Sequence, residues 1–248
     1  MPGGRIESSV IEAHLLKIRA RDALSREEEA AIRGAVGAVK EIPADTTLVR
    51  AGDKLSVSIL LLEGILCRYK DLRDGQRQIS ELHVAGDFAD LHGFTLKRLD
   101  HSVMALTRCR VAIVPHERLT AITRDHPHLT RIYWFLTNVD AAIHREWVLS
   151  LGRRTAISRL AHLFCELHFR LGLVGLADET GYALNLTQVD LAECLGLTPV
   201  HVNRVLRELR ERGLVEFRGG RVAIRDRPGL ERVAEFDPSY LYLEHRPR

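Results

Sequence analysis

The sequence predicts an α+β protein with a β-roll of jelly-roll type, one long helix, and a pair of short helices followed by a β-hairpin, which together form a winged helix-turn-helix. Three observations support this order. Glycine turns recur roughly every ten residues through residues 42–115. Residues 128–151 contain no glycine or proline. Residues 187–225 carry helix caps, a tight turn and a Gly-Gly pair in one unbroken order.

The chain begins with a segment of helical character, residues 6–40. Its best-marked helix has the sequence REEEAAIRGAV and follows Ser25, whose hydroxyl can accept a hydrogen bond from a free backbone N–H of the first turn.

The β-rich segment contains short runs of Val, Ile and Leu. These runs are broken at Gly52-Asp53, Glu63-Gly64, Asp74-Gly75 and Gly86-Asp87, a pattern typical of a sandwich or a jelly-roll barrel. Barrels of this kind can be metal enzymes of the cupin type, so a cupin-like metal-dependent enzyme joined to a helical interaction module is the alternative function.

Histidines are plentiful in and after this segment, at His83, His92, His101, His116, His126 and His128. They do not form the His-x-His pair followed shortly by Glu that a cupin-type metal site needs. We therefore expect no metal site and no enzyme activity, and surface or hydrogen-bonded core histidines instead.

The long helix carries an apolar stripe at steps of three and four residues: Leu129, Ile132, Leu136, Val139, Ile143, Trp147 and Leu151. This spacing predicts a coiled-coil-like dimer contact. A helix lying on its own barrel is the alternative, and both can hold for different faces.

Gly152, Arg153 and Arg154 are expected to break the helix and form a solvated hinge. A further amphipathic helix is expected over residues 156–171, with Leu160, Leu163, Phe164 and Leu167 on one face.

The first short helix of the C-terminal motif begins after its N-cap, Thr187. Asp190, three residues later, can form the reciprocal capping interaction. Gly196 ends this helix, because glycine readily adopts the left-handed conformation of a C-cap. The residues expected to face the core are Val189, Leu191, Ala192 and Leu195.

The second short helix has Thr198 as its N-cap and Pro199 at its first position. Helical spacing turns Val202, Val205, Leu206 and Leu209 inward and leaves Val200, His201, Asn203, Arg204 and Arg207 on the outer side. Gly213 ends this helix. Residues 214–217 and 222–225 then form a hairpin through Gly219-Gly220, with Arg218 and Arg221 on its shoulders.

A motif of this form can place its second helix in the major groove of DNA. Arg204 can then donate paired hydrogen bonds to a guanine, while Arg207, Arg218 and Arg221 contact phosphates. At the starts of the two helices, the DNA backbone is expected to be bound by Thr187, Gln188 and Thr198. The side of the second helix that faces the groove also carries Val200, His201 and Asn203. The alternative is a helical hairpin used for protein contact.

The whole-chain composition fits two domains of ordinary size. The chain has 248 residues, 46% of them hydrophobic, a formal charge of +3 and a pI near 8.8, which permits nucleic-acid binding. Its four cysteines show no CxxC pair, so neither zinc nor an iron–sulfur cluster is expected. The absence of a long apolar stretch or a signal-peptide pattern predicts a soluble, cytoplasmic protein without membrane contact.

This order of parts is similar to the Crp/Fnr family of bacterial transcription regulators. The most specific matches are Gly86-Asp87-Phe88 and residues 187–206. The resemblance implies a homodimer that binds a palindromic promoter site and contacts RNA polymerase. It also implies an effector domain over residues 1–126, a dimerisation helix over 127–152 and a DNA-binding domain over 153–248.

Members of that family that bind cyclic nucleotides carry a glutamate for the ribose and an Arg-Ser pair for the cyclic phosphate. In an alignment without gaps, these positions are Leu91 and His101-Ser102. The effector pocket expected around Asp90, Leu91, His101 and Ser102 therefore lacks both the glutamate and the arginine that bind the nucleotide. We expect that cyclic AMP is not bound tightly.

Two other departures from the family bear on the effector and on the DNA site. The oxygen-sensing members use an N-terminal cysteine cluster, and the first 66 residues here contain no cysteine. A different small ligand, a haem, a cysteine-based redox response and control without a ligand all remain open. In the reading helix, Val200 stands where better-known members have a glutamate, so the cytosine contact of that glutamate should be lost.

Overall fold

The computed structural model describes residues 10–247. It begins with α1 (Glu12–Arg19) and α2 (Arg26–Gly34). Ser25 caps α2 as predicted, in a reciprocal capping box with Glu28. The predicted helical segment was too long at its C-terminal end, because residues 38–42 pair as a strand. Residues 6–9 of that prediction lie outside the described part of the chain.

The roll, residues 38–115, follows these helices. Its strands are β1 (Ala38–Ile42), β2 (Thr46–Val49), β3 (Val57–Glu63), β4 (Leu66–Asp71), β5 (Arg77–His83), β6 (Ser102–Ala105) and β7 (Cys109–Pro115). They pair antiparallel in the orders β1-β7-β3 and β2-β6-β4-β5. The predicted turn glycines, Gly52, Gly64, Gly75 and Gly86, all have positive φ, which an L side chain rarely adopts. The short α3 (Gly93–Leu96) lies between β5 and β6, and α4 (His116–Asp125) follows β7.

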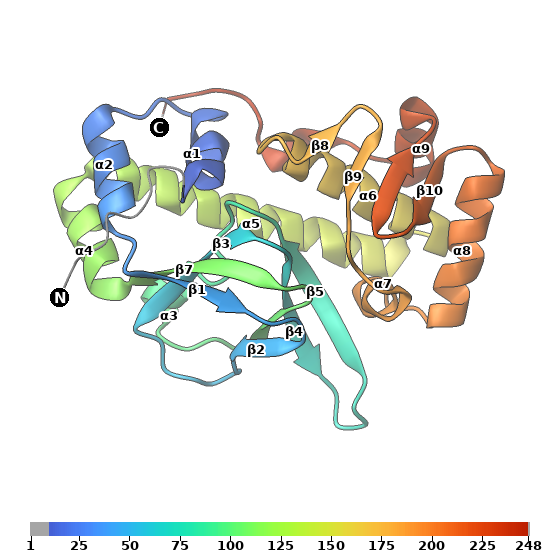
Figure 1. Cartoon of the computed structure of the whole chain (residues 1–248), viewed down its shortest axis with the longest axis horizontal. Helices are drawn as coiled ribbons and strands as arrows, with labels where there is room; N and C mark the ends of the chain where they lie inside the picture. Colours follow the sequence, from blue (N-terminus) through green and yellow to red (C-terminus); the bar gives the residue numbers. More distant parts are fainter. Residues whose placement is uncertain (1–9, 248) are drawn as a thin grey trace.

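The long helix α5 (Pro127–Arg153) crosses the molecule from α4 to the C-terminal half (Figure 1). The predicted apolar stripe is present, but it packs on its own chain. Leu129 and Ile132 lie in a core with α1, α2 and α4, while Val139, Ile143 and Trp147 lie in a core with β5 and α6. The prediction that this stripe forms a dimer contact was therefore wrong, and the alternative of a helix on its own barrel holds for this face.

The break after α5 also lies later than predicted. Gly152 is still helical, and the chain turns at Arg154 (ψ 146°) before Thr155 caps α6 (Ala156–Gly172). Arg154 is not solvated, because it pairs with Glu146 at 2.5 Å and is largely buried. The expected apolar face of α6 is buried, with Leu160, Leu163, Phe164 and Leu167 in the core.

The C-terminal half, residues 156–247, contains the predicted helix pair and hairpin. Its further elements are β8 (Ala177–Asp178), β9 (Gly181–Ala183), α7 (Gln188–Leu195), α8 (Pro199–Glu211), β10 (Val215–Arg218), β11 (Arg221–Ile224), α9 (Arg227–Ala234) and the 3-10 turn η1 (Pro238–Leu241). The hairpin joins a sheet of order β10-β11-β9-β8, of which β8 and β9 were not predicted. Val189 was predicted to face the core but is 53% exposed.

The roll and the C-terminal half share one hydrophobic core. Side chains of β4 and β5 pack in the same cluster as those of α5, α6 and α7. Gln78 of β5 adds a hydrogen bond to the Glu193 carbonyl at 2.8 Å. The C-terminal segment then runs back to α1 (Figure 1), where Arg21 donates to the Leu241 carbonyl at 3.0 Å and the Arg246 amide donates to the Arg21 carbonyl at 2.9 Å. The two halves are thus joined at more than one place.

Candidate nucleic-acid interface and interior cavity

Local sequence fixes the start of α8 and the face that it buries. Thr198 accepts a hydrogen bond from the His201 amide, and Pro199 occupies the first turn, where a missing N–H breaks no helical bond. Val202, Val205 and Leu209 are buried, so the opposite side must face away from the core. In Figure 1, α8 lies at the edge of the molecule that is farthest from α2 and α4.

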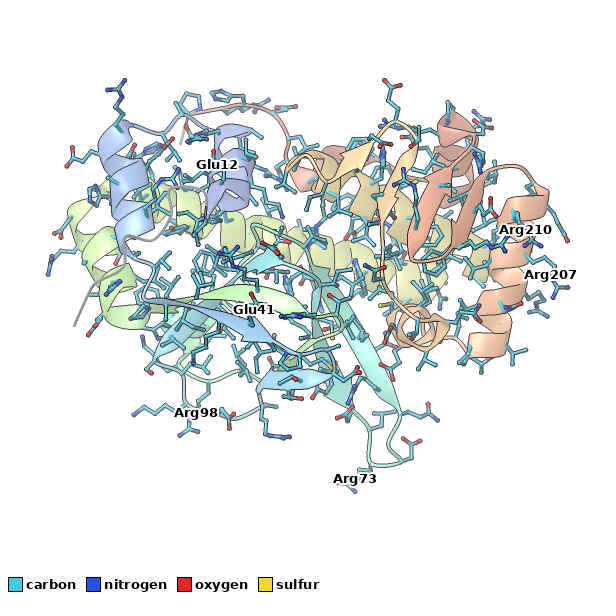
Figure 2. All side chains as sticks on the ribbon, in the orientation of Figure 1. Glu12, Glu41, Arg73, Arg98, Arg207 and Arg210 are labelled. Carbon is cyan, nitrogen blue, oxygen red and sulfur yellow. The ribbon has the colours of Figure 1, made fainter. Side chains whose placement is uncertain are left out.

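The outer side of α8 is exposed and carries two arginines that make no polar contact with the described part of the chain. Val200 is 81% exposed, and Asn203, Arg204 and Arg207 are also exposed. Within residues 10–247, Arg204 and Arg207 form no hydrogen bond or ion pair with another residue. Figure 2 shows Arg207 and Arg210 pointing away from the protein. These guanidinium groups can therefore meet a partner without first breaking an internal contact.

The residues expected at the helix starts lie beside this face. The Thr187 hydroxyl accepts from the Asp190 amide and donates to its carboxylate, so it is committed to the cap of α7. Gln188 accepts a hydrogen bond from the Asn203 side chain at 3.4 Å, which links the start of α7 to the outer side of α8.

The two hairpin arginines differ in their surroundings. Arg218 and Arg221 are opposite each other across the turn between β10 and β11. Arg221 donates to the Thr180 hydroxyl at 2.9 Å and lies 3.7 Å from the Asp178 carboxylate. Arg218 is exposed, and Arg221 would have to share its β8–β9 contacts with any phosphate.

The four residues expected around an effector pocket do not converge on one cavity. The Asp90 carboxylate is buried and accepts from the Ile59 amide at 2.6 Å, and burial raises its pKa to about 7. His101 pairs with Asp100, and Ser102 accepts from the Ala51 amide. Leu91 lines an interior cavity of about 70 Å³.

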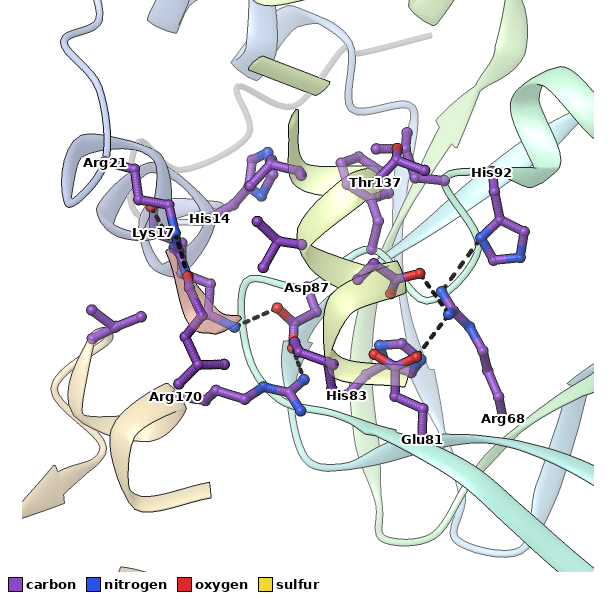
Figure 3. Close-up of a pocket in the computed structure, with 18 residues that line it drawn as sticks. His14, Lys17, Arg21, Arg68, Glu81, His83, Asp87, His92, Thr137 and Arg170 are labelled. Carbon is purple, nitrogen blue, oxygen red and sulfur yellow. Dashed lines mark hydrogen bonds and ion pairs between the residues drawn. The ribbon is translucent and has the colours of Figure 1, made fainter. Parts of the chain in front are cut away.

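That cavity lies between α1, the roll, α5 and α6, and its wall combines apolar side chains with two clusters of charged groups (Figure 3). On one side, Asp87 contacts Lys17 of α1 at 2.5 Å and Arg170 of α6 at 2.9 Å. Burial alone would raise the pKa of Asp87, but the two cations outweigh it and hold the pKa well below its usual range. Arg170 also pairs with Glu166 at 2.8 Å, so these bonds join α1, the roll and α6.

A second charged cluster lies on the other side of the cavity. Arg68 of β4 contacts the carboxylates of Glu81 at 2.9 Å and Asp140 of α5 at 2.8 Å, beside His83 and His92. Burial, followed by the field of Arg68, lowers the pKa of His83 well below its usual range and that of His92 to about 4, so both imidazoles are neutral at pH 7.

Sequence reasoning missed this second cluster. It sought a His-x-His pair, whereas Glu81 and His83 form a Glu-x-His pair in β5, where residues two apart share a face. The sequence signal that could have found Glu81 and His83 is this spacing of two residues within a strand. Asp140 could not be found in this way, because its position in the cluster depends on the packing of α5.

The four cysteines, Cys67, Cys109, Cys165 and Cys194, are all buried and free. Burial raises the pKa of each thiol, to about 12 for Cys165. Because the thiolate is the reactive form, these residues are poorly suited to redox chemistry in this conformation.

Comparisons with known proteins match both halves. Residues 39–126 match a cyclic nucleotide-binding domain, and residues 158–233 match a Crp-like helix-turn-helix domain. The chain is 31% identical to the nitrogen fixation regulation protein FixK of Azorhizobium caulinodans over 70% of each chain. It is 25% identical to the fumarate and nitrate reduction regulatory protein of Escherichia coli K12, over 79% of this chain and 78% of that protein.

Among solved structures, FixK2 from Bradyrhizobium japonicum aligns with a TM-score of 0.71 and 25% identity, covering 80% of this chain and 97% of that one. In the part of the chain that the structure describes, none of the helices combines the length and the apolar character needed to cross a bilayer.

Proposed function

Because this chain belongs to the Crp/Fnr family of transcription regulators, we propose that it binds an inverted-repeat promoter site as a homodimer and acts without cyclic AMP. We propose further that it is a regulator and not an enzyme, that it works in the cytoplasm, and that it contacts RNA polymerase. The observation that carries the proposal is the open outer side of α8, with Arg204 and Arg207 uncommitted to any described residue.

The proposed docking places the N-terminal half of α8 in the major groove. Arg204 donates to one guanine, and Val200 offers an apolar contact such as a thymine methyl group. Phosphate contacts come from Arg207, Arg218 and Arg221, and the helix starts at Thr187, Gln188 and Thr198 hold the DNA backbone.

The proposed dimer uses a different face of α5 from the buried stripe. Trp134 is 70% exposed, Val148 is 59% exposed, and the half-buried Ala141 lies between them at the same seven-residue step. Seven-residue steps keep a helix face in register with a partner helix. Large apolar side chains exposed in this register favour a second copy as the covering surface.

Two features of the cavity support independence from cyclic AMP. Its volume of about 70 Å³ is far below the roughly 300–1,000 Å³ of small-molecule pockets. Arg68, which lines the cavity from the roll, already pairs with Glu81 and Asp140, and an incoming phosphate would have to displace these two side chains. Calorimetry that detected micromolar cyclic AMP binding would refute this part of the proposal.

The test of the regulator proposal is selection of random duplex DNA on the purified, ligand-free dimer at a stated salt concentration. We expect enrichment of an inverted repeat whose half-sites lie about one helical turn apart. Enrichment of a single half-site would contradict the dimeric arrangement. No enrichment by folded protein would contradict DNA binding without an effector.

A further inference from the structure

Three potential metal ligands meet at the wall of the interior cavity. Glu81 and His83 extend from the same face of β5 (Figure 3). Asp140 of α5 lies close to both. One ligand atom from each lies within 4.8 Å of the other two. Ligand atoms around a first-row metal ion are about 3–3.5 Å apart, so small side-chain rotations would complete such a set.

Two atoms of this cluster are buried without a partner. Oε1 of Glu81 and Nε2 of His83 accept or donate no hydrogen bond to any described residue, although each side chain is about 99% buried. Buried polar atoms are normally satisfied, so two unpaired ones on neighbouring members of this cluster indicate that another species belongs there. Here one is a carboxylate oxygen and the other an imidazole nitrogen, both of which are lone-pair donors to metals.

The donor atoms of the cluster suit a metal ion. Arg68 donates to only one oxygen of each acid, Oε2 of Glu81 and Oδ2 of Asp140. This contact leaves Oε1 of Glu81 to the interior.

We propose that Glu81, His83 and Asp140 bind one divalent first-row transition-metal ion. One imidazole and two carboxylates suit manganese, iron, cobalt or zinc better than a soft ion such as copper(I). Arg68 stays on the outer carboxylate oxygens and orients these ligands. The adjoining cavity of about 70 Å³ exceeds the roughly 10–15 Å³ that a buried water needs, so water can complete the coordination. The ion would join β5 to α5 directly.

The test uses full-length, tag-free protein that has been stripped with a chelator. Titration with cobalt(II) chloride, followed by visible absorption, and with zinc sulfate, followed by calorimetry, should give one ion per chain. His83→Gln should weaken binding about tenfold or more. His162→Gln is the matched control, because His162 is as deeply buried but lies away from the cluster, and it should bind as the wild type does.

Asp140→Asn provides a second variant, since Asp140 is partly exposed and its loss is less disruptive to the core. Far-UV circular dichroism of each metal-free variant checks the fold. Weaker binding by folded Asp140→Asn supports the site even if His83→Gln unfolds. No stoichiometric ion in the wild type, or wild-type affinity in both folded variants, would overturn the proposal and leave the cluster as a hydrated ion-pair network.

Discussion

Arg204 is the residue on which the proposed DNA reading depends most directly. Its side chain is exposed on α8 and is uncommitted within the described chain. We expect Arg204→Ala to cost about 1–3 kcal/mol of specific binding and to relax the choice at one base pair in each half-site. Competition binding against a panel of single-base variants of the selected site measures both effects.

Arg232→Ala is the control for that measurement. It removes the same charge from an exposed position of the same half, on α9 instead of α8. The control should retain base preference, with only a small loss of overall affinity. The docking of α8 is wrong if Arg204→Ala keeps both its affinity and its preference.

Asp90 gives a pH-dependent prediction at the residue scale. Its folded pKa of about 7 lies above the ordinary value of about 3.9. Between these values the folded protein holds a proton that the unfolded chain has lost. The contribution of Asp90 to stability is therefore complete below about pH 4 and falls by about 1.4 kcal/mol per pH unit until about pH 7.

Asp90→Asn removes this titration while keeping a similar shape. Urea unfolding at pH 5, 6, 7 and 8 should show the variant gaining stability relative to the wild type as the pH rises to about 7. A difference between the two proteins that stayed constant across this range would show that Asp90 is ionised in the folded state.

Residue-level chemistry explains which predictions from sequence succeeded. Caps such as Ser25, Thr187 and Thr198 depend on neighbours three residues away, so local sequence is sufficient to place them. The charged cavity was not predictable in this way, because Arg68 and Asp140 are 72 residues apart in the chain. Their contact exists only after α5 has packed on the roll.

At the scale of elements, α5 shows that the spacing of apolar residues predicts the buried side of a helix but not the surface that covers it. Steps of three and four located the apolar side of the helix, and that side is buried. The same pattern did not reveal which surface covers it, since a stripe on the chain's own roll and a stripe on a second copy obey the same spacing.

The exposed face of α5 gives the prediction at this scale. Trp134→Glu places a charge where the second helix should pack, so the dimer should weaken by at least about tenfold. Sedimentation equilibrium at micromolar concentrations measures this change. Leu96→Glu alters an apolar residue of similar exposure in α3, outside α5, and should leave the dimer intact. Unchanged association of Trp134→Glu would place the dimer contact elsewhere.

At the scale of the whole molecule, Arg170 holds the C-terminal half against the roll. Its guanidinium binds Glu166, Asp87 and the Leu82 carbonyl and is almost completely buried. Arg170→Met would leave two buried carboxylates short of a partner and should lower the unfolding free energy by about 3–5 kcal/mol.

Chemical unfolding followed by tryptophan fluorescence tests this prediction. Arg225→Met is the control, because the Arg225 pair with Glu216 is at the surface and should contribute no more than about 1 kcal/mol. Equal effects of the two substitutions would show that the buried network adds little to the attachment of the halves.

The hydrogen bonds between Arg21 and the last turns of the chain have a consequence for synthesis. Arg21 and Leu241 are 220 residues apart in sequence. A ribosome adds about 5–20 residues each second, so α1 emerges many seconds before its C-terminal partner exists. The roll can collapse during translation, but the segment that follows α1 must wait until residue 241 has been synthesised to acquire these contacts. The attachment of α1 to the C-terminal half should therefore be a late folding step.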